Sequence, residues 1–170
     1  MTARPKTTAK TEKAKKSAKP APAKKKAAPK PKGACLNPYL IFNGNCEAAF
    51  KLYQKVFGGK IDCLYRYKEM PPEEGKVDAK LRNKILHMSL PVGEMMLMGA
   101  DACLESPVTM GDNVSLSICA PSTAEAKRIF KALSMRGKVI TPLAKTFWAE
   151  LYGMARDRFG ICWMVSYSES

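Results

Sequence analysis

The sequence predicts an α+β fold in which a strand-helix-strand-strand-strand module occurs twice, and two observations predict it. Apolar residues recur first with the two-residue period of a strand and then with the helical period, in the same order in both halves of the chain after residue 36. The two halves also match at a constant offset, with Gly59-Lys60-Ile61 corresponding to Gly137-Lys138-Val139. A duplication explains both observations economically.

The first module is expected at about residues 36–100. A short apolar strand ends at Asn43-Gly44, and Asn45 then stands at the N-cap position of a helix that Gly58 ends. A loop rich in Pro, Glu and Gly separates the second and third strands. The four strands of this module are expected at residues 39–42, 60–67, 83–90 and 95–99.

The second module is expected at about residues 113–168. Ser122 followed by Glu125 predicts a capping box at the start of its helix, which stops at Gly137. Its four strands are expected at residues 113–119, 139–147, 149–155 and 161–167.

Neither module should be stable alone, because its helix covers only one side of its curled sheet. Pairing the two curved mixed or antiparallel sheets buries that apolar surface. Such an arrangement leaves a cleft lined by alternate strand side chains, and clefts of this kind hold small molecules.

Residues 1–33 carry most of the formal charge of +14. They contain 12 of the 29 Lys and Arg residues and one acid, so their charge is +11 and the remaining 17 bases and 14 acids leave +3. They contain no Val, Ile, Leu or aromatic residue, and five prolines oppose a continuous helix. We therefore expect a disordered basic tail, similar in composition to the tails of histone-like proteins, and a folded domain at residues 34–170.

The tail suggests two roles. It could be a solubilising extension, or it could bind nucleic acid without sequence specificity by neutralising phosphates, and the charge favours the second. No run of about 18 apolar residues predicts a membrane span, and no secretory signal is present. We expect a soluble cytoplasmic protein, with nucleoid association as a further option. The six cysteines have no metal-site spacing, which favours free and mostly buried thiols.

Several motifs of the folded part carry a resemblance to a known family. They are Asn37-Pro-Tyr-Leu-Ile-Phe-Asn-Gly-Asn-Cys-Glu-Ala-Ala-Phe, Met70-Pro-Pro, Ile85-Leu-His-Met-Ser-Leu, Leu97-Met-Gly-Ala-Asp, Lys145-Thr-Phe-Trp and Asp157-Arg-Phe-Gly-Ile-Cys-Trp-Met-Val. In these motifs the chain resembles the PhnB-like branch of the vicinal oxygen chelate superfamily, which includes glyoxalase I, extradiol dioxygenases and antibiotic-resistance binding proteins. The resemblance covers nearly all of residues 36–168.

The resemblance implies the glyoxalase-like fold and a homodimer, because members often complete their cleft between subunits. It also implies where a metal would bind in the superfamily's enzymes. Those positions fall here on Pro38 and Asn113 and on the last strands at Leu97 or Met98 and at Met164, none of which is a standard ligand. With a single histidine in the chain, we expect no metal and no other cofactor.

Members of this branch are often labelled 3-demethylubiquinone methyltransferase-like. The sequence contains no Gly-rich turn that follows a strand and opens a helix, as a methyl-donor site would require.

The predicted catalytic candidates are His87 and Asp101, at the middle and the end of successive strands. A His-Asp pair would suit proton transfer, although a lone histidine on a strand is also a common structural residue. Ligand-binding candidates are aromatic residues on strand faces, with one acid: Tyr65, Tyr67, Trp148, Glu150 and Tyr152. A solvent-exposed face is the alternative for all five.

Three hypotheses about function remain from the sequence. The first is a metal-free protein that binds a small organic molecule, with or without catalysis. The second is an enzyme of the glyoxalase or dioxygenase type that uses a metal with unorthodox ligands. The third is a nucleic-acid-associated protein that acts through its tail.

Overall fold

Both predicted modules are present, in the predicted order, in the part of the chain that the structure describes, residues 34–103 and 106–169 of a computed structural model. The expectation of a disordered tail at residues 1–33 lies outside the described residues. The first module consists of β1 (Tyr39–Phe42), α1 (Cys46–Phe57), β2 (Cys63–Arg66), β3 (Ile85–Val92) and β4 (Met95–Asp101). The second consists of β5 (Leu116–Cys119), α2 (Thr123–Ser134), β6 (Lys138–Ala144), β7 (Leu151–Arg156) and β8 (Cys162–Tyr167).

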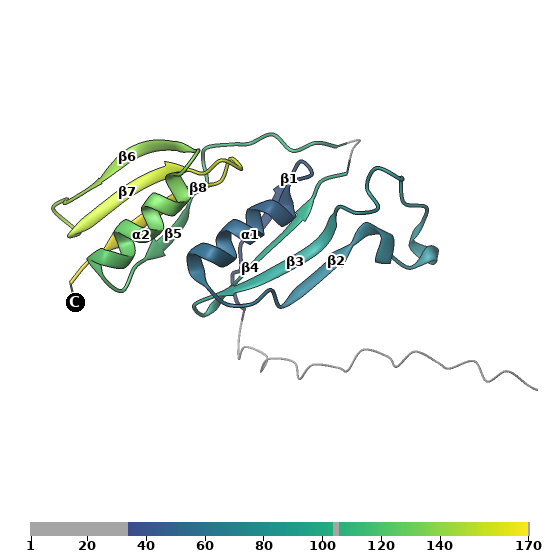
Figure 1. The fold of residues 1–170 in the computed structure, drawn as a ribbon, viewed down its shortest axis with the longest axis horizontal. Coiled ribbons are helices and arrows are strands. Elements are labelled where there is room, and N and C mark those ends of the chain that lie inside the picture. Colours follow the sequence, from purple (N-terminus) through teal and green to yellow (C-terminus); the bar gives the residue numbers. More distant parts are fainter. Residues whose placement is uncertain (1–33, 104–105, 170) are drawn as a thin grey trace, which may run out of the picture. The chain divides into compact units, whose positions relative to one another are not determined.

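Each module forms its own four-stranded sheet. The first sheet has the order β1-β4-β3-β2 and the second the matching order β5-β8-β7-β6. In each sheet the first and last strands of the module pair in parallel and the other neighbours pair antiparallel. Figure 1 shows α1 lying across the first sheet and α2 across the second. The predicted α+β class with mixed sheets is therefore confirmed.

The strand after each helix differs from its prediction. β2 begins three residues later than expected, and its pairing with β3 shifts between Tyr65 and Arg66. The chain then turns into a short 3-10 helix, η1 (Tyr67–Glu69), and a second one, η2 (Pro72–Glu74), follows in the Pro-rich loop. β6 ends at Ala144, and residues 145–150 form the connection to β7. Thr146 and Ala149 are joined there by hydrogen bonds, so these residues do not continue the strand.

The two helices begin in different ways. Ser122 caps α2 as predicted, because its hydroxyl accepts a hydrogen bond from the backbone N–H of Glu125 at 3.2 Å. Asn45 stands at the N-cap position of α1, but its side chain makes no cap bond. The carboxylate of Asp101, from the end of β4, instead accepts from the N–H of Cys46 at 2.8 Å. A charged group from a distant strand thus satisfies the first turn of α1.

One apolar core runs through both modules. Tyr53 and Phe57 of α1 pack on Trp163 of β8, with ring centroids 5.1 Å and 5.4 Å apart. The guanidinium of Arg128 on α2 donates to the backbone oxygen of Val56 at 2.7 Å. Helix α1 therefore covers its own sheet and also contacts the second module, which joins the two modules into one unit, Cys35–Ser170.

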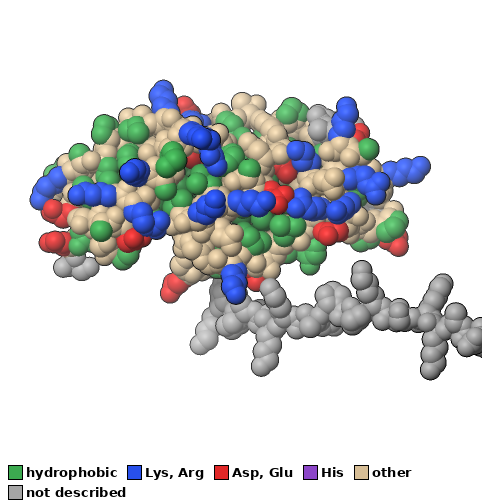
Figure 2. All heavy atoms as spheres, in the orientation of Figure 1, with side chains coloured by type: hydrophobic (Ala, Val, Ile, Leu, Met, Phe, Trp, Pro, Cys, Tyr) green, Lys and Arg blue, Asp and Glu red, His purple; other side chains and the backbone are tan. Residues whose placement is uncertain are grey.

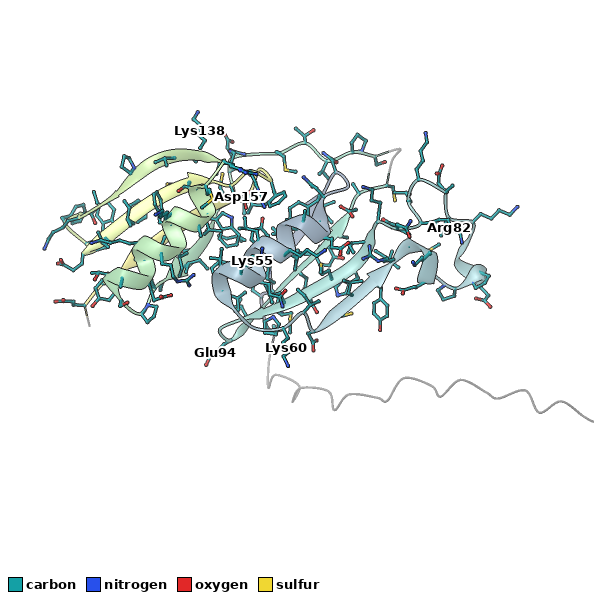
Figure 3. All side chains as sticks on the ribbon, viewed as in Figure 1. Lys55, Lys60, Arg82, Glu94, Lys138 and Asp157 are labelled. Atoms are coloured by element: carbon teal, nitrogen blue, oxygen red, sulfur yellow. The ribbon has the colours of Figure 1, made fainter. Side chains whose placement is uncertain are left out.

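Asp157 lies in the turn before β8 and stabilises the contact between the two modules. It is 3% exposed, and Figure 3 shows it between α1 and the second sheet. One of its carboxylate oxygens accepts from the hydroxyl of Tyr53 at 2.7 Å and from the indole N–H of Trp163 at 2.9 Å. The other accepts from the backbone N–H groups of Phe159 and Ile161. The carboxylate thus joins α1 to the second module.

The six cysteines are all free thiols, as predicted, but they are less buried than predicted. Cys46 and Cys162 are buried, whereas Cys35, Cys103 and Cys119 are exposed because they lie outside the packed strand centres. No helix in the described part of the chain has the length and apolar character needed to cross a membrane.

Candidate functional site

Each sheet has one face that its helix covers and one face that points away from the helix. In the first sheet, Gly99 marks the covered face, because an added Cβ there would lie 2.7 Å from the ring of Phe50 on α1. The strand registers place Met88 beside Gly99 and Ser89 beside Met98, so alternate residues point away from α1. We call this the open face of the first sheet; it is formed by Tyr39, Ile41, Cys63, Tyr65, His87, Ser89, Pro91, Met96, Met98 and Ala100.

His87 and Tyr39 form a hydrogen-bonded pair on this open face. The hydroxyl of Tyr39 lies 3.1 Å from Nδ1 of His87, and the two rings are 5.7 Å apart and tilted by 32°. Tyr65 on β2 stands directly opposite His87 in the strand register. Tyr39 is 44% exposed and Tyr65 55% exposed, so both rings are accessible. The open face therefore presents two phenol rings beside one imidazole.

Tyr67 and Cys103 extend this group beyond the ends of β2 and β4. The hydroxyl of Tyr67 donates to the backbone oxygen of Asp101 at 2.9 Å and lies 3.7 Å from the sulfur of Cys103. Burial, followed by the hydrogen bond to Cys103, raises the pKa of Tyr67 to about 12. Burial also raises the pKa of Tyr39 above its usual value. Both phenols therefore stay neutral donors at physiological pH.

The predicted His87–Asp101 pair does not form. The carboxylate of Asp101 is 3% exposed and points to the covered face, where it accepts from the N–H groups of Cys46 and Ile85 at 2.8 Å and 2.9 Å. His87 points to the opposite face. Successive residues of a strand alternate between faces, and the sequence spacing of the two strands did not fix which face Asp101 would take.

The second sheet places Tyr152 as the alternation of β7 indicates, whereas Trp148 and Glu150 lie in the connection before β7 rather than on the predicted strand. Gly153 lies on the covered face, since an added Cβ would lie 2.8 Å from the ring of Phe130 on α2. Tyr152 points the other way and packs on Trp148, with ring centroids 5.6 Å apart. Trp148 also packs edge to face on Phe147. Glu150 is bound by Lys145 at 2.7 Å, so this carboxylate is paired.

The structure therefore divides the predicted ring-bearing residues between the two modules. His87, Tyr65 and Tyr67 belong to the first module, and Trp148 with Tyr152 belongs to the second. No hydrogen bond or ring contact joins these two groups among the described residues. A single chain thus does not assemble all of them around one cavity.

A pocket of about 820 Å³ lies between the modules, and none of the predicted catalytic or ligand-binding residues lines it, although the motif-matched positions Pro38 and Leu97 do. Its walls come from the end of α1, the β3–β4 turn, the start of β4 and the length of β5. Leu97 and Trp163 form its apolar floor, and both are nearly fully buried in the core. Its polar side chains are few: Glu94, Ser115, Ser117 and Cys119.

Charge separates the two sides of the first module. The exposed side of α1 carries Lys51 and Lys55, and Figure 2 shows Lys and Arg side chains spread over the helix-bearing face of the molecule, on which no His is visible. The open face of the first sheet contains no Asp, Glu, Lys or Arg. Its polar groups are hydroxyls, a thiol and the imidazole.

The residues that the structure describes offer no ligand set typical of a divalent metal ion. Nowhere in residues 34–103 and 106–169 do three His, Cys, Asp or Glu side chains gather in a suitable arrangement. The motif-matched positions Pro38, Asn113 and Met164 offer no imidazole or carboxylate, and His87 already uses Nδ1 toward Tyr39. Burial also raises the pKa of the Cys46 thiol, so this thiol stays protonated.

Tyr39 is the site residue that sequence reasoning missed. It lies on β1, and the hydrogen bond to His87 reaches across β4, which stands between β1 and β3. The available signal was the alternation Tyr39-Leu40-Ile41-Phe42, in which the tyrosine is opposite in face to the buried Phe42. That alternation places Tyr39 on the open face but does not indicate its partner.

The folded part of the chain matches a protein-family model. The model described as "3-demethylubiquinone-9 3-methyltransferase" matches residues 34–166. The curated protein YjdN of Escherichia coli K12 is 26% identical over 137 residues, which is 77% of this chain and 93% of that relative. The family match excludes the basic segment at residues 1–33.

Two solved structures show the same fold. Protein PA1353 of Pseudomonas aeruginosa is 38% identical, with a TM-score of 0.74 over 81% of this chain and all of that chain. A protein from Bacillus cereus described as a putative 3-demethylubiquinone-9 3-methyltransferase, PhnB protein, is 23% identical, with a TM-score of 0.63 over 78% of this chain and 98% of that one. The second likeness concerns the fold alone.

Proposed function

Because the chain belongs to the 3-demethylubiquinone-9 3-methyltransferase family, the PhnB-like branch of the vicinal oxygen chelate superfamily, we propose that it binds a small organic molecule against its open sheet faces without a metal ion. The observation that carries the proposal is the Tyr39–His87 pair on an accessible aromatic face without charged side chains. Flat apolar rings with a few fixed polar groups are typical of ligand sites.

The open faces support the site better than the pocket between the modules does. The pocket is lined mainly by apolar side chains, Phe57 and Trp163 among them, and contains no tyrosine or histidine. The open faces instead combine accessible aromatic rings with phenol and imidazole groups. Aromatic rings bury a large area, and their polar atoms orient a ligand.

A second copy of the chain completes the cleft in this proposal. Each open face exposes large apolar side chains, Tyr39 and Tyr65 on the first sheet and Trp148, 54% exposed, on the second. Exposed apolar patches of this kind mark interaction surfaces. If the first sheet of one copy faces the second sheet of another, both predicted residue groups line one cavity. Light scattering on the eluting full chain should give twice the mass of 18.7 kDa; a monomer at micromolar concentration contradicts this arrangement.

The experiment that tests binding is a thermal-shift screen of metabolites against the full chain. Hits are then titrated against Tyr65→Ala and Trp148→Ala, which remove exposed rings from the two open faces. Val114→Glu places a charge in the pocket between the modules, and Met135→Ala removes an exposed side chain away from both sites. We expect both ring variants to weaken binding at least tenfold and the other two to leave it unchanged. Loss of binding in Val114→Glu alone assigns the ligand to the pocket and contradicts the proposal.

The metal-dependent alternative is tested on the same preparation. A divalent ion present at one equivalent per chain after purification and gel filtration, with activity that a chelator removes, favours an enzyme with unorthodox ligands. We expect less than about one tenth of an equivalent, because the described donor set lacks convergent ligands.

A second candidate function rests on the charge of residues 1–33, which is +11 by sequence. We propose that this segment binds nucleic acid without sequence specificity, which would place the protein with the nucleoid in the cytoplasm. Affinity for duplex DNA should fall steeply with salt, because phosphate neutralisation releases counterions. Deleting residues 1–33 should abolish binding. A truncated protein that binds as well as the full chain contradicts this role.

A further inference from the structure

The open face of the first sheet also indicates which kind of ligand it takes, an inference that rests on the proposed function. His87 is the single histidine of the chain and stands between two exposed phenol rings, Tyr39 and Tyr65. Its Nδ1 is 3.1 Å from the hydroxyl of Tyr39. The direction of this hydrogen bond decides what the other ring nitrogen, Nε2, can offer to a ligand.

Relative basicity sets that direction. An imidazole nitrogen is a much stronger base than a phenol oxygen, so the proton of the bond belongs to Tyr39 and the lone pair to Nδ1. A neutral imidazole that accepts at Nδ1 carries its proton at Nε2. The raised pKa of Tyr39, caused first by burial, keeps the phenol protonated in this role. His87 is thereby held as an Nε2–H donor.

The surrounding side chains disfavour a charged ligand. The ten residues of the open face include no Asp, Glu, Lys or Arg, and the Asp101 carboxylate near the end of β4 is used on the opposite face. An ionised ligand would lose hydration there without gaining a counter-ion. A neutral ligand loses less on binding and can still accept one hydrogen bond.

We propose that the open face of the first sheet binds an uncharged, flat aromatic compound through a carbonyl oxygen, which accepts from Nε2–H of His87 while the ring stacks on Tyr65. Tyr39 is a positioning residue, because it acts through the tautomer of His87. The Tyr67 hydroxyl already donates to the backbone oxygen of Asp101.

The tautomer is tested first, and no ligand is needed. Nitrogen-15 labelling of histidine gives the signals of one imidazole, recorded at about pH 8.5, where imidazole is neutral. We expect Nδ1 to resonate as an unprotonated nitrogen and Nε2 as a protonated one. In Tyr39→Phe the two shifts should move toward each other as tautomers mix, while Tyr152→Phe, which removes a hydroxyl from the second sheet, should leave them unchanged. A protonated Nδ1, or identical spectra for Tyr39→Phe and the unchanged chain, overturns the inference.

Ligand class is tested with three probes of matched shape, titrated into the full chain: 2-acetylnaphthalene, 2-ethylnaphthalene and 2-naphthoate. The ketone should bind about fivefold more tightly than the hydrocarbon, the ratio that one hydrogen bond gives. It should bind at least tenfold more tightly than the carboxylate, which must lose its hydration. His87→Phe should remove the preference for the ketone over the hydrocarbon.

The outcomes separate this inference from the proposed function. If the three probes bind equally and compete with one another, small-molecule binding stands and the inference about ligand class fails. Tightest binding by 2-naphthoate also overturns the inference. If none of the probes binds at up to millimolar concentration and the metabolite screen yields no ligand, both the proposed function and the inference fail.

Discussion

Replacing the buried Asp157 by alanine should destabilise the folded unit more than replacing an exposed acidic residue does. The carboxylate is 3% exposed and receives four hydrogen bonds, two from side chains and two from backbone N–H groups. Asp157→Ala leaves the Tyr53 hydroxyl and the Trp163 indole N–H without acceptors in the core. Both belong to the contact between α1 and the second module.

The magnitude follows from these lost partners. Each buried donor left unsatisfied costs about 1–3 kcal/mol, so the two side-chain donors together cost about 2–6 kcal/mol. The two backbone groups lie in a turn where water can replace the carboxylate, and they add little. We expect the free energy of unfolding to fall by about 3–5 kcal/mol, a large part of the 5–15 kcal/mol typical of a domain. Asp157→Asn should cost less, about 1–3 kcal/mol, because its amide keeps one acceptor.

Urea denaturation followed by circular dichroism measures this change, with Asp112→Ala as the matched control. Asp112 is exposed and lies in the segment just before the second module, so its removal should change the free energy of unfolding by less than about 0.5 kcal/mol. A double-mutant cycle with Tyr53→Phe should give a coupling energy of about 1.5–3 kcal/mol, the value for a hydrogen bond to a charged group. If Asp157→Ala unfolds within about 0.5 kcal/mol of the unchanged chain, this account of the module junction is wrong.

Three further predictions concern stability, each measured by denaturation. Ser122→Ala should lower the free energy of unfolding by about 1 kcal/mol, because it removes a helix cap. Asn45→Ala should change it little, because the Asn45 side chain makes no cap bond. Equal losses for the two variants would contradict the capping assignment. Hydrogen bonds from Lys51 and Arg66 lower the pKa of Glu47 in the folded protein. The contribution of Glu47 to the free energy of unfolding is therefore complete above the pKa of an unfolded glutamate, about 4.3. It is lost as the pH falls through the lower pKa of the folded protein. Glu47→Gln should therefore cost a few tenths of a kcal/mol at pH 7 and nothing at about pH 2, and a cost independent of pH would exclude an ionic cause. Gly99→Ala should lower the free energy of unfolding by about 1–3 kcal/mol, because the added Cβ would lie 2.7 Å from the ring of Phe50. Gly111→Ala should change it little, because its added Cβ would lie 3.2 Å from the flexible side chain of Asn113. An unchanged stability of Gly99→Ala would show that α1 can shift.

Much of the fold could be predicted because its signals are local. The order of strands and helices follows from apolar periodicity, and the repeat doubles that evidence. The face of Tyr152 could also be predicted, because Gly153 beside it has no side chain and suits the face that packs on α2. The later start of β2 was not predictable in this way, since it depends on where its pairing with β3 shifts.

The sequence by itself determined the duplicated module, the concentration of charge in residues 1–33 and the alternation that places His87 on one face of its strand. Tertiary structure alone decided which residues these side chains contact. The order β1-β4-β3-β2 brings Tyr39 to His87 across an intervening strand, and the fold commits Asp101 to the first turn of α1 rather than to the histidine. Both outcomes depend on contacts between residues more than 40 positions apart. Local periodicity carries no information about such contacts, because it fixes the direction of a side chain but not its partner.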